Sequence, residues 1–304
     1  MHRPEIPIID LIRNPEHPLL SLEFFPPKDE KGMGQLKKVA QQLLVTHPNF
    51  VTCTWGAGGS THRRTLTVCE MLQTIGFPPI MPHLTCVGES RLALGNIAAE
   101  IYNHGFRNIM TLRGDPPRGE STFVMHPNGF KYASELVLFL KNRYPDVCCG
   151  VAGYPEAHPE SESVEEDIRH LKEKVEAGAS FITTQLFFDN ALYFSFVDRC
   201  RNKGIDVPII PGLLPAISLK QVERFTNMCG ALFPEKLAAN MRKVGGEGEA
   251  AQQVGIKWCA DQINELLDSG VPGIHLYVLN RSNAALAPAV MDCFSRKRPL
   301  GIIS

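Results

Sequence analysis

The chain has 304 residues, a formal net charge of −1 and a sequence pI near 6.8. Hydrophobic residues make up 44% and charged residues 21%, which is typical of a folded globular protein and excludes a disordered or fibrous chain. The nearly balanced charge gives no basis for a general nucleic-acid or anionic-membrane surface. We therefore expect small-molecule chemistry, with no nucleic-acid partner.

Cysteine usage and the N-terminus indicate the compartment. The chain has 9 cysteines, an odd number, and none forms a C-x-x-C pair. Several lie in apolar runs, so we expect small buried hydrophobic side chains in a reducing compartment. No segment has the apolar core of a signal peptide or the length of a membrane span. These features predict a cytoplasmic protein.

Strand-like and helix-like segments alternate along the chain. Runs that are apolar and bounded by Pro, Gly or Asn are predicted to be strands, and segments with apolar residues at helical spacing follow them. The alternation predicts a (β/α)8 TIM barrel, a single domain over residues 1–304 with its core at about 18–296 and an elaboration before the last strand. The predicted strands are 19–25, 50–55, 79–86, 106–112, 146–152, 181–188, 207–214 and 273–279.

Polar residues gather where these strands end. In a TIM barrel the active site lies at the carboxyl ends of the strands, so these residues are expected to line one pocket. They are Glu23, Thr54, Trp55, His83, Thr85, Arg113, Asp115, Tyr154, His158, Gln185, Tyr277, Asn280 and Arg281.

Single residues in this set allow two interpretations. Glu23, before two prolines, is either a general acid whose pKa burial raises or an exposed carboxylate on an edge strand. The Arg-Gly-Asp turn at 113–115 fits a ligand site or a loop ion pair, and His83 fits a catalyst or a core histidine. Asp167 and Lys174 on one predicted helix would ordinarily be surface charges.

Several chemistries lack their motifs. The chain has no P-loop, no H-E-x-x-H zinc motif and no serine nucleophile elbow. No metal site is expected, because the histidines do not pair at metal-ligand spacing. Gln185 lies in an apolar run, and a buried amide needs partners that a ligand could supply. A pocket of this composition suits a large organic cofactor.

Nine short motifs in order resemble one enzyme family. They are 23–27 (EFFPP), 54–56 (TWG), 82–85 (PHLT), 112–115 (LRGD), 132–134 (YAS), 154–159 (YPEAHP), 184–188 (TQLFF), 211–215 (PGLLP) and 279–281 (LNR). The chain resembles the methylenetetrahydrofolate reductase family, specifically its flavin-containing barrel, from about residue 21 to 294.

The resemblance implies noncovalent FAD, reduced by NADH or NADPH, and reduction of 5,10-methylenetetrahydrofolate to 5-methyltetrahydrofolate. Glu23 would be the general acid that opens the imidazolidine ring, and Asp115 and Gln185 would complete the catalytic set. Gln185, Gln221, Phe225, Tyr277 and Arg281 would bind substrate. The residues implied for FAD are Thr54, Trp55, Ala57, His83, Arg113, Gly114, Asp115, Tyr132, Ala133, Tyr154, His158, Asp167, His170 and Lys174.

Two other functions fit the same residues. One is a barrel that binds flavin or folate without turnover, and the other is a related folate-dependent flavoenzyme acting on a different one-carbon unit. We also expect a homo-oligomer that uses folate and a nicotinamide dinucleotide as its small-molecule partners.

Overall fold

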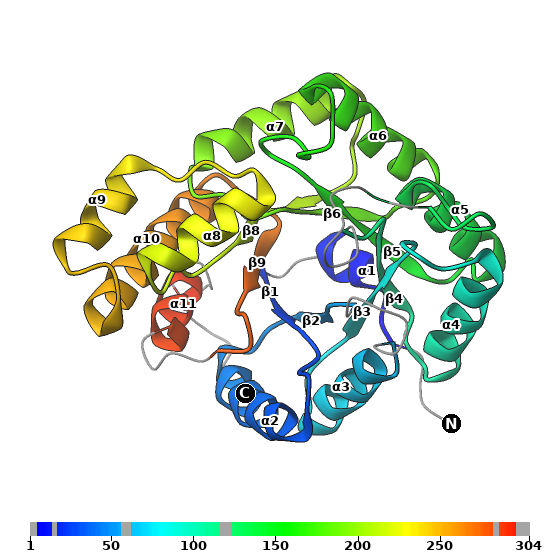
Figure 1. Cartoon of the computed structure of the whole chain (residues 1–304), viewed down its shortest axis with the longest axis horizontal. Coiled ribbons are helices and arrows are strands. Elements are labelled where there is room, and N and C mark those ends of the chain that lie inside the picture. The colour runs from blue at the N-terminus through cyan, green and yellow to red at the C-terminus, as the bar shows by residue number, and fades with distance from the viewer. Residues whose placement is uncertain are drawn as a thin grey trace.

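The computed structural model describes residues 5–13, 17–55, 62–115, 123, 125–281 and 286–295. Within these residues, parallel strands form one sheet in the order β7-β6-β5-β4-β3-β2-β1-β9-β8, which curves into a nearly closed barrel with helices around it (Figure 1). The (β/α)8 prediction is confirmed. The strands are β1 Leu19–Phe24, β2 Phe50–Cys53, β3 Ile80–Thr85, β4 Asn108–Leu112, β5 Cys148–Gly153, β6 Phe181–Thr184, β7 Ile209–Ile210, β8 Gly212–Leu213 and β9 Gly273–Tyr277.

Helices lie between the strands on the outside of the barrel (Figure 1). Several begin at side-chain caps: for example, the Ser163 hydroxyl accepts the Glu166 amide at the start of α6, and the Ser218 hydroxyl accepts the Gln221 amide at the start of α8. The helices are α1 Ile8–Arg13, α2 Glu30–Leu43, α3 His62–Ile75, α4 Arg91–Asn103, α5 Ala133–Arg143, α6 Val164–Glu176, α7 Asn190–Asn202, α8 Leu219–Cys229, α9 Glu235–Lys243, α10 Gly248–Asp268 and α11 Leu286–Ser295, with a 3-10 turn at Leu44–Thr46.

The seventh predicted strand closes the barrel in two pieces. β7 pairs with β6 and β8 pairs with β9, and Pro211 lies between them. Proline has no N–H to give to a ladder, so the strand divides there. The Pro211 carbonyl still accepts a hydrogen bond from the His275 amide at 2.9 Å. The single predicted strand at 207–214 therefore supplies both edge strands of the sheet, β7 and β8.

The barrel interior changes from apolar to polar along the strands. Near the amino ends of the strands, buried Leu19, Phe50 and Met81 form an apolar cluster with Ile8 and Ile12 of α1. Two residues further along β1 and β2, the inward side chains are Ser21 and Thr52, since alternate residues share one face of a strand. One end of the barrel is therefore filled with hydrocarbon, and the other end can hold a polar site.

Helix α1 closes the apolar end and was not predicted from the sequence. It has only six residues, too few to show helical periodicity. The Asn108 side chain accepts the Ile8 amide at 2.7 Å and donates to the Ile6 carbonyl at 3.1 Å, which attaches this segment to the start of β4. Figure 1 shows α1 within the outline of the barrel.

The predicted elaboration before the last strand contains a second helix that the sequence did not indicate. No helix was predicted within residues 230–248, but α9 lies there between α8 and α10. Its buried Leu237 and Met241 pack with Val222 of α8 and Leu214, which follows β8. The three helices project from one side of the barrel (Figure 1).

All nine cysteines lie among the described residues, and none is in a disulfide; eight are buried, as predicted. In the described part of the chain, no helix is long and apolar enough to cross a membrane. Over the same residues, no three His, Cys, Asp or Glu side chains are placed to hold a metal ion.

Glu5 makes the stability of the apolar end dependent on pH. Burial raises its pKa to about 7, although hydrogen bonds from the Ile80 amide and Asn108 oppose the rise. A raised pKa stabilises the fold below about pH 4.5, and this stabilisation is lost as the pH rises through about 7. We expect Glu5→Gln to raise the free energy of unfolding by about 1–3 kcal/mol at pH 8 and much less at pH 5.

Urea unfolding at both pH values measures this effect. The control is Glu249→Gln at an exposed position of α10. This substitution should change the free energy of unfolding little at either pH. An equal effect of Glu5→Gln at pH 5 and pH 8 would contradict the assignment.

Candidate active site

A cavity of about 1080 Å³ opens at the carboxyl ends of the strands. Its size exceeds that of ordinary pockets for drug-sized ligands, which are ~300–1,000 Å³. Eighteen of the residues named from the sequence line it: Glu23, Thr54, Trp55, His83, Thr85, Arg113, Gly114, Asp115, Tyr132, Ala133, Tyr154, His158, Asp167, His170, Lys174, Gln185, Phe225 and Tyr277.

Glu23 lies at the floor of this cavity between two histidines. Its Oε2 is 3.5 Å from Nε2 of His83 and 3.6 Å from Nε2 of His275, and the Thr52 hydroxyl is also at 3.5 Å. Pairing of β1 with β2 and β9 brings Thr52 and Tyr277 level with Glu23. Glu23 is thus on an interior strand of a barrel, so the edge-strand alternative is wrong.

The electrostatics of this cluster differ from the expectation. Burial raises the pKa of Glu23, but the contact with His275, the charges of His83 and His275 and the Thr52 hydroxyl outweigh burial, so its pKa lies below its ordinary value. Burial lowers the pKa of His83 to about 4. The prediction of a raised Glu23 pKa assumed an isolated carboxylate, and it is wrong because two histidines lie beside it. With its pKa below the ordinary value, the Glu23 carboxyl group is ionised near neutral pH.

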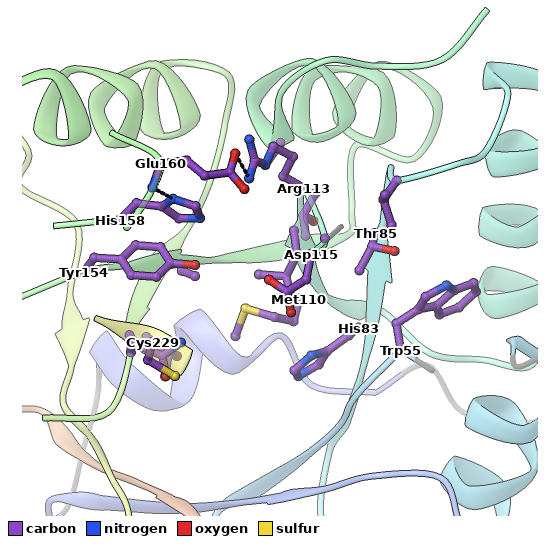
Figure 2. A pocket seen from close by; sticks show the side chains of 18 of the residues that line it. Trp55, His83, Thr85, Met110, Arg113, Asp115, Tyr154, His158, Glu160 and Cys229 are labelled. Carbon is purple, nitrogen blue, oxygen red and sulfur yellow. Dashed lines mark hydrogen bonds and ion pairs between the residues drawn. The ribbon is translucent and has the colours of Figure 1, made fainter. Parts of the chain in front are cut away.

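The turn after β4 places Arg113, Gly114 and Asp115 on the cavity wall. Gly114 has φ +92°, and a Cβ there would come within 2.6 Å of a Val87 methyl carbon, so the close approach of this turn to the β3 end needs glycine. Arg113 Nη2 is 2.7 Å from Glu160 Oε2. Figure 2 shows the Arg113 side chain reaching Glu160, with Asp115 directed away from this pair. Arg113 is therefore in an ion pair, but its partner is Glu160 and not the Asp115 that the ion-pair interpretation of the turn had expected.

The loop after β5 and helix α6 supply the facing wall. Tyr154 packs edge-on against His158 with ring centroids 4.7 Å apart (Figure 2). Burial lowers the pKa of His158 and raises that of Asp167. Burial lowers the pKa of Lys174 to about 8, and the Lys174 Nζ donates to the Ala152 carbonyl at 2.7 Å. Asp167 and Lys174 are thus cavity groups, not surface charges.

The start of α5 continues this wall. Tyr132 precedes α5, and its backbone N–H donates to Glu135 at 3.0 Å. Its ring stacks on His170 with centroids 4.9 Å apart, and Ala133 beside it is buried. This pair of rings provides a flat surface that suits a planar ligand group.

The residues expected to bind substrate fall into two groups. Gln185, Phe225 and Tyr277 line the cavity, and the Tyr277 hydroxyl donates to the Thr184 carbonyl at 2.6 Å. Gln221 is outside the lining, where its Oε1 accepts the Ile217 amide at 2.8 Å. Arg281 is exposed and also outside the lining. Of the residues expected to bind FAD, Ala57 lies outside the described residues.

Sequence reasoning missed several lining residues. His275 contacts Glu23 and is only 1% exposed. It lies two residues before Tyr277 on β9, so alternation from Tyr277 could have identified it. Thr183 of β6 likewise lies two residues before Gln185, which follows that strand. Glu160 carries no signal in the sequence beyond being in a long loop.

The fold and cavity define a (β/α)8 barrel with a large polar ligand site at the carboxyl ends of its strands, the usual place for the active site of an enzyme of this fold. The family model for methylenetetrahydrofolate reductase matches residues 9–291. The chain belongs to the methylenetetrahydrofolate reductase family.

Individual relatives agree with this assignment. The Arabidopsis thaliana protein "Methylenetetrahydrofolate reductase (NADH) 1" is 37% identical over 88% of this chain, which spans 47% of that relative. The Escherichia coli "5,10-methylenetetrahydrofolate reductase" is 37% identical over 88% of each chain. The chain thus spans about half the length of the plant relatives and most of the bacterial one.

A solved structure supports the fold alone. It is an uncharacterized protein from Clostridium thermocellum that binds two copies of 5-methyl-5,6,7,8-tetrahydrofolic acid. It superimposes with a TM-score of 0.65 over 95% of this chain and 98% of its own, at 16% identity.

Proposed function

We propose that this chain reduces 5,10-methylenetetrahydrofolate to 5-methyltetrahydrofolate with NADH or NADPH and noncovalent FAD. The observation that carries the proposal is the Glu23 carboxylate, held between His83 and His275 on the floor of a cavity large enough for a dinucleotide. Membership of the family supports the reaction and the cofactor. FAD, when bound, would pass a hydride from the nicotinamide to the folate.

The cavity fits such a cofactor. The hydroxyls of Thr85 and Thr183 are buried and have no hydrogen-bond partner within the described residues. A bound ligand could supply the missing hydrogen bonds. Half-buried Lys174 and Arg113 supply positive charge for phosphate groups, and the stacked rings of Tyr132 and His170 supply a flat surface. These residues, with Thr54, Trp55, His83, Gly114, Asp115, Ala133, Tyr154, His158 and Asp167, would hold the flavin dinucleotide.

Glu23 would hold and transfer the proton. Opening of the imidazolidine ring needs an acid beside a ring nitrogen, and Glu23 Oε2 is the atom that would deliver it. The two histidines lower its pKa, but a planar ligand would exclude water and strengthen the opposing effect of burial. Substrate binding would therefore favour the protonated acid. Asp115 and Gln185 would orient the folate above it.

Anaerobic absorbance spectroscopy tests this proposal directly. The purified protein should carry a yellow flavin, lose its visible absorbance with NADH or NADPH and regain it with 5,10-methylenetetrahydrofolate. Titration with each donor separately establishes which nicotinamide it uses. A barrel that binds flavin or folate without turnover would show no bleaching, and a colourless protein that does not bind FAD would contradict the proposal.

Two finer points belong to the same proposal. We infer a cytoplasmic enzyme, which the nine cysteines outside disulfides support. We also propose a homo-oligomer, which size-exclusion chromatography with light scattering tests.

A further inference from the structure

The charge of the cavity is unexpected for a site that takes phosphate groups. Among the described lining residues, three side chains are cationic and seven carry carboxyl groups. Carboxylates repel phosphates, so each cation has to be both present and accessible to an anionic ligand. The cations are Arg113, Lys131 and Lys174, and the carboxyl groups belong to Glu23, Glu89, Asp115, Glu160, Glu162, Glu166 and Asp167.

Each cation already has a partner. Lys174 Nζ donates to the Ala152 carbonyl, and Lys131 Nζ lies 4.9 Å from the centre of the Tyr132 ring. Arg113 is the only arginine in the described lining, and its guanidinium carbon lies 4.7 Å from the centre of the Phe123 ring. Its Nη2 is taken by Glu160 Oε2 at 2.7 Å. The group best shaped for phosphate is therefore paired with a carboxylate of the same chain.

The Glu160 backbone does not depend on this ion pair. Its amide donates to His158 Nδ1 at 3.0 Å, and the Ser161 amide donates to the His158 carbonyl at 2.9 Å. The loop is also held by Arg199, which donates to the Pro155 carbonyl at 2.8 Å. Glu160 could therefore release Arg113 by side-chain rotation alone, because 37% of its side chain is exposed and water could solvate the freed carboxylate.

We infer that Glu160 is an internal competitor for the cofactor site: its carboxylate occupies the place on Arg113 that the diphosphate of the flavin dinucleotide takes. The inference rests on the proposed function and adds a determinant of cofactor affinity. Carboxylate and phosphate oxygens both match the N–H edge of a guanidinium, so one must leave for the other to bind there. If the phosphate bound other N–H groups of Arg113, the negative charge of Glu160 would still repel it. In both arrangements Glu160 therefore lowers the affinity for the flavin dinucleotide.

The test is the affinity of flavins for the protein stripped of its cofactor, measured by fluorescence titration. Glu160→Gln should bind FAD about twofold to fivefold more tightly than the unchanged protein, the range expected for loss of a partly exposed ion pair. Riboflavin, which has no phosphate, should bind both proteins equally. Thermal unfolding without flavin should show no stabilisation by the substitution, which separates competition from a general gain in stability.

Two further variants isolate the pair. Glu162→Gln removes the same charge from the same loop, and no ion pair between Glu162 and Arg113 is present, so its gain in FAD affinity should be clearly smaller than that of Glu160→Gln. In an Arg113→Gln background, which itself weakens FAD binding, adding Glu160→Gln should give a smaller gain than in the unchanged protein, because only the charge repulsion and not the competition for Arg113 remains to be removed. In the flavin-loaded protein, Glu160→Gln should leave the KM for NADH unchanged, because the competing phosphate belongs to the flavin.

The contrary outcomes are separable. Unchanged or weaker FAD binding by Glu160→Gln would overturn the inference, as would an equal gain by Glu162→Gln or for riboflavin. A lower KM for NADH with unchanged FAD affinity would also overturn it, because Glu160 would then compete with the nicotinamide dinucleotide. Failure of every form, the unchanged protein included, to bind any flavin would contradict the proposed function itself.

Discussion

Replacing Glu23 with Gln should separate the two half-reactions. The folate half-reaction should slow by about 10²- to 10⁴-fold, the usual contribution of a general acid, because an amide cannot deliver the proton. The amide keeps the size of the side chain and an acceptor oxygen between His83 and His275. Bleaching of the flavin by NAD(P)H needs no acid from Glu23 and should stay within a fewfold of its original rate. Anaerobic stopped-flow absorbance measures both steps.

The control for this substitution is Glu89→Gln, the same change at another lining residue. It should leave both half-reactions nearly unchanged. If Glu23→Gln slowed both half-reactions equally, Glu23 would have a structural role in shaping the site. If it slowed neither, the proton would come from another group.

The fold was largely predictable because its signals are local. Alternation of apolar runs with periodic segments identified every strand position, and Ser163 and Ser218 marked helix starts. The errors arose where tertiary contacts decide: α1 is too short for a periodic signal, and the break at Pro211 follows from the pairing of one strand with two neighbours.

The site was predictable where its residues lie at or near the carboxyl ends of the strands. Residues directly after strands could be named once the barrel was assumed, as Gln185 and Tyr277 were. His275 lies deeper in the barrel, and its contact with Glu23 depends on the register between β9 and β1, which joins segments about 250 residues apart. The lowered pKa of Glu23 depends on that contact, so it could not be predicted from Glu23 and its neighbours in sequence.

A glycine within α10 should have a large effect on stability. Gly255 lies where the helix crosses Ala216, and a Cβ there would come within 1.9 Å of the Ala216 carbonyl oxygen. Alanine is favoured over glycine in a helix by about 1 kcal/mol, but here the contact is with backbone and neither partner can rotate away. The crowding should outweigh that gain and lower the free energy of unfolding by about 2 kcal/mol or more. Chemical denaturation measures the change.

The matched control is Gly95→Ala within α4. A Cβ at Gly95 would lie 3.4 Å from a Phe139 ring carbon, an ordinary contact, so the same substitution should be neutral or stabilise by up to about 1 kcal/mol. Gly255→Ala should also weaken flavin binding, because Ala216 lies two residues after Leu214, which lines the cavity. Equal stability of the two variants would show that α10 can move away from Ala216 at little cost, and the position of α10 would then not constrain the cavity wall.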